Sequence, residues 1–182
     1  MNASTFTGMR IFTTPLLLAA ASLCSGAALA HVTLQTAQAQ AGSGYKAVLR
    51  VPHGCKGAAT TQLSVQIPAG VIAVKPQPKP GWEITMTHGK YAQAYAYHGA
   101  QLTEGVRTIT WSGGPLPDAY YDEFVFSSQI ASTLAPGTPL YFPVVQTCGQ
   151  AVQRWIEIPA AGQTGHLEMP APSLHLTPKE TP

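Results

Sequence analysis

The feature that most constrains this chain is a series of short runs in which apolar and polar residues alternate, separated by glycine and proline. The run at 60–67 is the clearest, because Leu63, Val65 and Ile67 share one face. A repeat of two places successive side chains on opposite faces of a β-strand. Three prolines within 75–81 exclude a helix there, and no other stretch carries a sustained helical period.

About nine such runs, spaced by turn residues, are typical of an antiparallel β-sandwich, so we predict an all-β fold of immunoglobulin or cupredoxin type. The pairs His88-Gly89 and His98-Gly99 are predicted to be exposed hairpin turns. The predicted strands, with a further short apolar piece at 71–74, are 32–35, 45–51, 60–67, 82–87, 91–97, 106–111, 123–130, 140–146 and 152–158.

Residues 1–30 have the organisation of a secretory signal. Arg10 precedes an apolar stretch at 14–21, and Ala28-Leu29-Ala30 forms a small-residue cleavage site. We therefore expect export to the periplasm, a single β-sandwich domain at 31–160, and a flexible proline-containing tail at 161–182.

The composition of the chain excludes several classes of partner. Charged residues make up 10% of the sequence and form no basic cluster, so nucleic acid is not an expected partner. The net charge is +2, and falls to +1 without the signal. No second long apolar run follows the signal, so no membrane anchor is predicted.

Cleavage after Ala30 would leave two cysteines, Cys55 and Cys148. An oxidising compartment favours a disulfide between them. The alternative is a pair of thiolate ligands for copper(I).

The same cleavage would make His31 the first residue of the mature protein. Its α-amine and imidazole could then close one chelate ring on a metal ion. Copper(II) binds such nitrogen sites more tightly than the other divalent first-row metals, although nickel and zinc also accept them.

Two further residues are candidates for the metal site. His53 ends a strand beside Cys55, in a loop that a disulfide would hold, and Trp155 lies on a strand where a core position is the common role. His166 and His175 fall in the predicted tail and receive no role. No catalytic triad, carboxylate pair or phosphate-binding loop is present, and no His or Met near Cys148 supports a blue-copper site.

Several motifs, in order, resemble the YcnI-like family of exported copper-binding proteins. The resemblance covers roughly 31–158 and rests on His31-Val32-Thr33-Leu34 after the signal, Leu49-Arg50-Val51-Pro52, Ile67-Pro68-Ala69-Gly70-Val71, Pro80-Gly81-Trp82, Ile109-Thr110-Trp111-Ser112-Gly113-Gly114, Glu123-Phe124-Val125-Phe126, and Val145-Gln146 to Trp155-Ile156.

The resemblance implies a β-sandwich that binds copper(II) through a mono-histidine brace, in which an N-terminal His, a Glu and a Trp form the site. His31 and Trp155 match the first and last of these. Where better-known members read Val-Pro-Asn-Glu, this chain reads Val-Pro-His-Gly at 51–54, so the carboxylate is missing. Either His53 replaces it, or the site is more open.

The function expected from these observations is copper(II) binding in trafficking or homeostasis, without enzymatic activity. The implied partners are the copper ion and other copper-handling proteins of the envelope. Two alternatives remain. One is a copper-dependent oxidative enzyme resembling polysaccharide monooxygenases, which use a second His. The other is an adhesion or interaction module in which His31 has no role.

Overall fold

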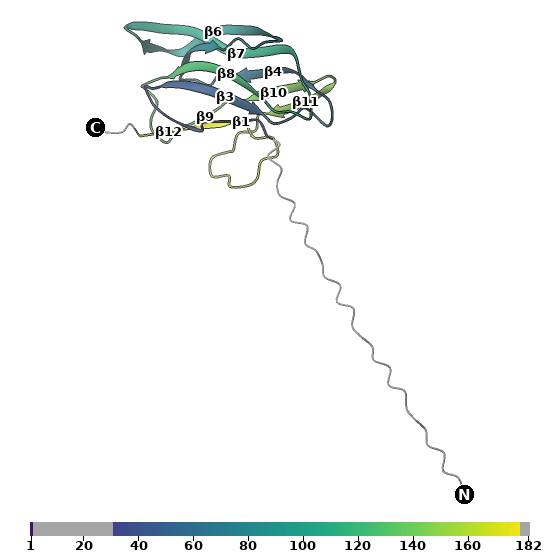
Figure 1. Ribbon diagram of the computed structural model, residues 1–182. Coiled ribbons are helices and arrows are strands. Elements are labelled where there is room, and N and C mark those ends of the chain that lie inside the picture. Colours follow the sequence, from purple (N-terminus) through teal and green to yellow (C-terminus); the bar gives the residue numbers. More distant parts are fainter. Residues whose placement is uncertain (2–30, 179–182) are drawn as a thin grey trace.

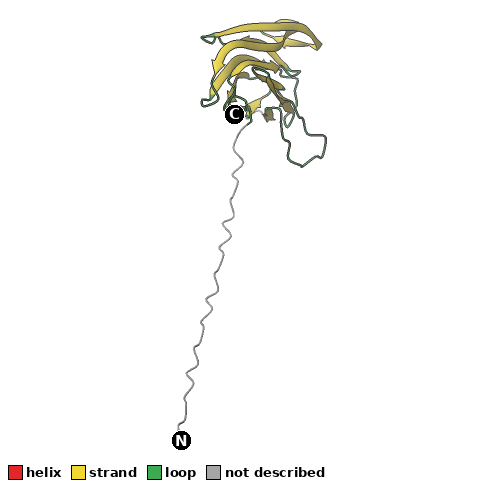
Figure 2. Ribbon diagram, turned by 90° about the vertical axis from the view of Figure 1, so that its right-hand side faces the viewer, coloured by secondary structure: helices red, strands yellow, loops and turns green. Residues whose placement is uncertain are grey.

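The alternating runs fold into strands that pack as a β-sandwich, as predicted. The computed structural model describes residue 1 and residues 31–178, so the predicted signal lies outside the described residues apart from Met1. Strands and loops account for the whole of the described domain at 31–178, as Figure 2 shows. Within that domain there is no helix long and apolar enough to cross a membrane.

Within residues 31–178, twelve strands form three sheets. The first has the order β1-β3-β8-β5, from Thr33–Leu34, Gly44–Val51, Asp122–Ile130 and Val71–Pro76. The second has the order β11-β10-β4-β7-β6, from Ala151–Trp155, Val144–Cys148, Thr60–Gln66, Ala100–Leu116 and Trp82–Tyr97. The third has the order β2-β12-β9, from Gln38–Gln40, Ser173–Thr177 and Pro139–Tyr141. Every pairing is antiparallel except that of β2 with β12.

The core is formed by the buried faces of the first two sheets together with strands of the third. The alternation read from the sequence decides which side chains enter it, since Leu63 and Val65 of β4 are fully buried while Gln62 and Ser64, which precede them, are not. Apolar burial of this kind contributes about 25 cal/mol per Å² and is the main stabilising term of the fold. The largest fully buried side chains include Trp111, Phe124, Phe126, Phe142, Leu49, Ile109 and Leu174.

Two predicted strands, 82–87 and 91–97, form one long strand. The predicted turn at His88-Gly89 is wrong, because His88 lies inside β6, where the register with β7 shifts between Thr87 and His88. The other predicted turn is confirmed. His98 and Gly99 both have positive φ and join β6 to β7 directly, as a two-residue hairpin requires. At His88, by contrast, a bulge accommodates the shift in register and the strand continues without a turn.

The predicted strand 140–146 is divided at Pro143. The chain leaves the third sheet after β9 and enters the second as β10, and Pro143 stands at the crossing. Proline has no N–H to donate to a strand ladder. Because Pro143 lies between the two strands, neither ladder loses a hydrogen bond.

The prediction of a flexible tail from 161 onward is wrong for residues 173–177. Residues 173–177 form β12, which pairs with both β2 and β9. Leu174 and Leu176 are buried in the main core, while His175 between them is exposed. The tail therefore contains a period-two pattern too short to stand out in a proline-rich composition.

Candidate metal centre

His31 is positioned by the short strand that follows it. β1 pairs with β3 through Thr33 and Leu34, and Val32 and Leu34 are buried. The alternation leaves His31 and Thr33 on the opposite side from these apolar residues, where His31 is half-buried. The imidazole therefore stands at the surface on a backbone that the sheet holds in place.

The segment after β1 is anchored by a buried tyrosine. Tyr45 of β3 is 5% exposed, and its hydroxyl donates a hydrogen bond to the carbonyl oxygen of Thr36 at 2.6 Å. Burial raises the pKa of Tyr45 to about 12, because the phenolate would lose its hydration. The neutral hydroxyl thus keeps the chain after His31 against the first sheet.

Two aromatic rings lie against the imidazole of His31. The Trp155 ring meets it edge to face, with centroids 5.4 Å apart and planes inclined at 67°. The His166 ring lies 6.4 Å away at 37°. The structure thus brings together two residues predicted for the site, His31 and Trp155, and adds a third that the sequence analysis had left without a role.

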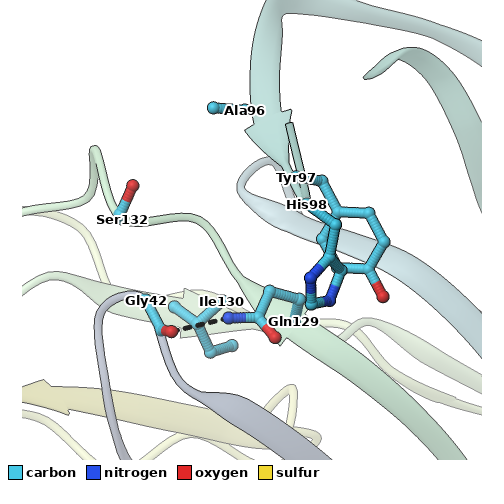
Figure 3. Close-up of a pocket in the computed structure, with 7 residues that line it drawn as sticks. All are labelled: Gly42, Ala96, Tyr97, His98, Gln129, Ile130 and Ser132. Atoms are coloured by element: carbon cyan, nitrogen blue, oxygen red, sulfur yellow. Dashed lines mark hydrogen bonds between the residues drawn. The ribbon is translucent and has the colours of Figure 1, made fainter. Parts of the chain in front are cut away.

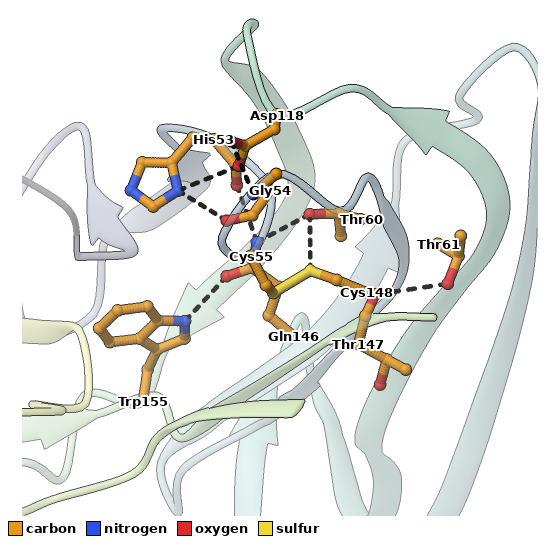
Figure 4. The surroundings of a disulfide bond; sticks show 11 residues. His53, Gly54, Cys55, Thr60, Thr61, Asp118, Gln146, Thr147, Cys148 and Trp155 are labelled. Atoms are coloured by element: carbon orange, nitrogen blue, oxygen red, sulfur yellow. Dashed lines mark hydrogen bonds and ion pairs between the residues drawn. A yellow bond between two sulfur atoms is a disulfide. The ribbon is translucent and has the colours of Figure 1, made fainter. Parts of the chain in front are cut away.

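Trp155 offers its ring and not its nitrogen. It ends β11 opposite Val144, is 2% exposed, and donates its indole N–H to Oε1 of Gln146 at 3.1 Å. Figure 4 shows the indole N–H directed at Gln146 and away from His53. An indole nitrogen that donates this hydrogen bond has no lone pair for a metal, so Trp155 acts as an apolar wall beside His31.

Gln146 links this wall to the disulfide end of the sandwich. Its side chain is 1% exposed, and its Nε2 donates both to the His53 carbonyl oxygen at 2.8 Å and to Oγ1 of Thr60 at 2.7 Å. Thr60 Oγ1 in turn lies 3.6 Å from Cys148 Sγ. Figure 4 shows this connected group. A buried amide with its hydrogen bonds made is worth more than isolated pairs and fixes the geometry around it.

The predicted disulfide between Cys55 and Cys148 is confirmed, with Cα atoms 5.8 Å apart. It joins the loop after β3 to the end of β10 across 93 residues of sequence. Both residues are buried. Their sulfurs are bonded to each other, so they are not the thiolate pair of the alternative interpretation.

His53 lies in that held loop, and its side chain is engaged locally. Its Nδ1 is 2.6 Å from the carbonyl oxygen of Gly54, to which it donates, and 3.9 Å from a carboxylate oxygen of Asp118. Figure 4 shows the ring directed toward these two groups. The rings in contact with His31 among residues 31–178 are those of Trp155 and His166. The role predicted for His53 as a ligand stays a prediction.

His31 borders two pockets. One, of about 330 Å³, is lined by 31–34 and Ala37 on one side and by 170–173 on the other. The second, of about 280 Å³, is lined by His31 together with Thr33, Arg50, Pro52 and Tyr121. Arg50 is paired with Glu123 at 3.6 Å, both partly exposed. An ion at His31 would therefore be reachable from solvent and from a partner protein.

A further pocket, shown in Figure 3, lies at the tip of the β6–β7 hairpin. It is lined by Tyr97, His98, Gly42 and Gln129 among others, and the amide of Gln129 donates to the Gly42 carbonyl oxygen at 2.6 Å. His98 is its one metal-binding side chain among the lining residues. This pocket lacks a second ligand and is not the candidate centre.

In the part of the chain that the structure describes, no three His, Cys, Asp or Glu side chains converge on one point. A metal at His31 would therefore use few side chains, and the α-amine of a mature N-terminus would be an important additional donor. Gln146 and His166 are the residues that sequence reasoning missed. A glutamine inside the alternating run of β10 was a visible signal, whereas nothing in the local sequence of His166 indicates its neighbour.

Comparisons with known proteins agree with the fold. The sequence matches the family described as "Domain of unknown function (DUF1775)" over residues 31–176. No curated protein matches it. The chain is similar to a solved structure of an uncharacterized protein from Nocardia farcinica with an immunoglobulin-like fold, at 26% identity and a TM-score of 0.61, covering 81% of this chain and 98% of that one. The match over residues 31–176 shows that this chain belongs to the DUF1775 family.

Proposed function

We propose that this chain is an exported copper(II)-binding protein of the cell envelope, which carries the ion as cargo in copper trafficking or homeostasis and is not an enzyme. The resemblance to YcnI-like proteins suggested this function. The observation that supports it best is the position of His31, at the first residue of the family domain, with its ring against a buried tryptophan.

Export is supported by two features. The Cys55–Cys148 disulfide suits an oxidising compartment. The family domain begins at residue 31, directly after the predicted cleavage site at Ala30. Cleavage there would free the α-amine of His31.

The residues at hand suit a nitrogen-preferring divalent ion. The amine and imidazole of His31 form the chelate, and copper(II) is the ion such donors bind most tightly. Trp155 excludes water from one side, and Gln146 fixes the orientation of its ring. The two pockets beside His31 leave the ion accessible to a receiving protein, which suits exchange and not permanent retention.

The test is a copper(II) titration of protein that begins at His31, compared with protein that carries one extra glycine before it. We expect binding of one equivalent that weakens sharply in the extended form, because the extra residue removes the amine from the chelate. Thermal unfolding of both forms without metal serves as the control for folding. Equal affinity in both forms would refute the proposed chelate.

One observation keeps the oxidative enzyme as a second candidate. A second imidazole, that of His166, lies beside His31. Tyr121 lines the smaller of the two pockets at His31, and both Tyr121 and its neighbour Tyr120 are exposed. Reductant-dependent consumption of oxygen or peroxide that increases with an insoluble glycan would favour this candidate. Its absence in copper-loaded protein would favour the cargo function.

A further inference from the structure

The loop that carries His166 leaves the sandwich after β11 and returns to β12. Figure 1 shows it projecting from the sandwich beside the point where the described domain begins. Its two ends are joined by three hydrogen bonds: the Glu157 N–H donates to the Met169 carbonyl at 3.0 Å, the Met169 N–H to Oε2 of Glu157 at 2.9 Å, and the Ala171 N–H to the Glu157 carbonyl at 2.9 Å. The base of this loop, 158–168, is therefore fixed while its apex is exposed.

A turn inside the loop limits its freedom further. The Gln163 N–H donates to the Ala160 carbonyl at 2.9 Å, and Oε1 of Gln163 accepts from the Ala160 N–H at 3.0 Å. The loop returns through 170–173, which line the same pocket as His31. The chain thus directs His166 back to the beginning of the domain.

The spacing of the two imidazoles suits one shared ion. A ring centroid lies about 3.2 Å from a metal that the ring binds through a nitrogen bond of about 2.0–2.1 Å, so two rings on opposite sides of one ion are separated by about 6.4 Å. The His31 and His166 centroids are 6.4 Å apart.

Other candidate donors of the described chain take part in hydrogen bonds. Oε2 of Glu157 accepts from Met169, and the Trp155 nitrogen donates to Gln146. His53 Nδ1 donates to Gly54. In contrast, neither the His31 nor the His166 ring takes part in a hydrogen bond or ion pair with a described residue.

We propose that His166 is a second imidazole ligand of the copper(II) ion bound at His31, and that it supplies a side-chain donor where the carboxylate expected from Val-Pro-Asn-Glu is missing. This assignment rests on the proposed function. The site is then built from both ends of the domain, with the brace from the segment before β1 and the second ring from the loop before β12. Binding of the ion ties the exposed loop to the sandwich.

The experiment compares three single variants in protein that begins at His31: His166→Ala, His53→Ala and His175→Ala. His175 is the matched control, because it is also exposed and lies in the same C-terminal segment. Copper(II) affinity is measured by competition with a chelator of known strength. Pulsed EPR counts the imidazole rings bound to the ion.

Residues that only orient a ligand are worth about 10- to 100-fold in metal affinity, so loss of a ligand itself is expected to weaken copper(II) binding by at least about tenfold in His166→Ala. The number of bound imidazoles should fall from two to one. His53→Ala and His175→Ala should keep both rings and the wild-type affinity. Copper(II) should also protect the 158–168 loop from proteolysis in wild type and not in His166→Ala.

Three outcomes would overturn the assignment. Two bound imidazoles and unchanged affinity in His166→Ala would exclude His166 as a ligand. Loss of a ring in His53→Ala instead would assign the second ligand to the held loop. Either of these two results would refute the His166 assignment but not the proposed function, provided that the glycine-extended form still binds copper(II) poorly. Failure of the wild-type protein itself to bind one equivalent would remove the proposed function and this inference together.

Discussion

Two histidines of this domain lie in opposite kinds of surroundings. His53 follows β3 in a loop held by the Cys55–Cys148 disulfide, and its ring nitrogen is engaged by its own neighbour, Gly54. His31 precedes the two-residue strand β1, and its ring lies beside those of Trp155 and His166, which are distant in sequence. The histidine beside the disulfide thus has a local partner, whereas the one before β1 meets residues from the other end of the domain.

A rigidly held loop is therefore not by itself a binding site. A disulfide fixes the backbone near His53, but its side chain already has a hydrogen-bond partner to lose. The His31 ring has aromatic neighbours and no such partner among the described residues, so a metal could bind it without breaking a hydrogen bond. Gln146 connects the two regions, because it bonds to both the Trp155 ring and the His53 carbonyl.

Removal of the disulfide should have the largest effect on stability and a small one on copper. Replacing Cys55 and Cys148 by alanine frees a loop with a sequence separation of 93, for which chain entropy gives a loss of about 4 to 5 kcal/mol in the free energy of unfolding. Urea denaturation measures this loss. Copper(II) affinity of the folded variant should stay within about twofold, as the site is at His31. Loss of copper binding in protein that circular dichroism shows to be folded would move the site to the His53 loop.

Leu174→Ala should destabilise the domain by about 2 to 5 kcal/mol, because Leu174 is fully buried and its truncation leaves a cavity. The same change disturbs the strand that follows the 170–173 lining of the His31 pocket. Chemical denaturation compared with His175→Ala, an exposed neighbour on the same strand, isolates the packing effect. Equal stability of the two variants would indicate that residues 173–177 are not packed in the core and belong to the flexible tail predicted from the sequence.

Gln146→Leu should cost about 1 to 3 kcal/mol, since it leaves the Trp155 N–H and the His53 carbonyl without their buried partner. Gln146→Glu is the informative second variant, because it keeps an acceptor for the indole and removes the donor to His53. If the Trp155 contact matters for the His31 site, Gln146→Leu should weaken copper(II) binding more than Gln146→Glu does. The reverse order of affinities would assign the influence to the His53 side.

Tyr45→Phe should have the smallest effect at neutral pH, about 1 kcal/mol, from the lost hydrogen bond to Thr36. Its alkaline behaviour is more distinctive. The folded pKa of Tyr45 is raised to about 12 from 10, so the unfolded chain loses this proton first and stability falls between pH 10 and 12. A two-unit shift corresponds to about 2 to 3 kcal/mol.

Free energies of unfolding at several values between pH 9 and 12 would measure this decline in wild type and Tyr45→Phe. The advantage of wild type over the variant should shrink and then reverse as the pH rises, because the variant lacks the titrating group. A constant difference across the range would show that the Tyr45 phenolate is not excluded from the folded protein.

The fold could largely be predicted from the sequence because its cause is local. The alternation in β4 and β8 predicts which side chains are buried. The His98-Gly99 turn is predictable because a two-residue hairpin turn requires positive φ, which glycine adopts readily. The errors occur where two local rules compete. At His88-Gly89 the sequence predicted a turn, but the strand continues through a bulge. At 173–177 the proline-rich composition favoured a flexible tail, although the five residues alternate regularly and form β12.

The candidate site could be predicted in part. His31 was recognisable because a predicted cleavage site adjoins it, and Trp155 because it belongs to a motif of the resemblance. His166 was not recognisable, since its meeting with His31 depends on how the loop closes between Glu157 and Met169. Gln146 was visible as a polar residue in an alternating run, but its role was not, because its three partners come from separate parts of the chain.

The parallel pairing of β2 with β12 has a consequence for the order of assembly. Residues 38–40 find their neighbours at 175–177, so the third sheet closes only when nearly the whole domain has been synthesised. Synthesis delivers the N-terminal end first. In a partly synthesised chain, residues 170–173 are therefore not yet present to line the pocket beside His31. A chain truncated before β12 would lack the third sheet. The pocket beside His31 is therefore complete only in a finished domain.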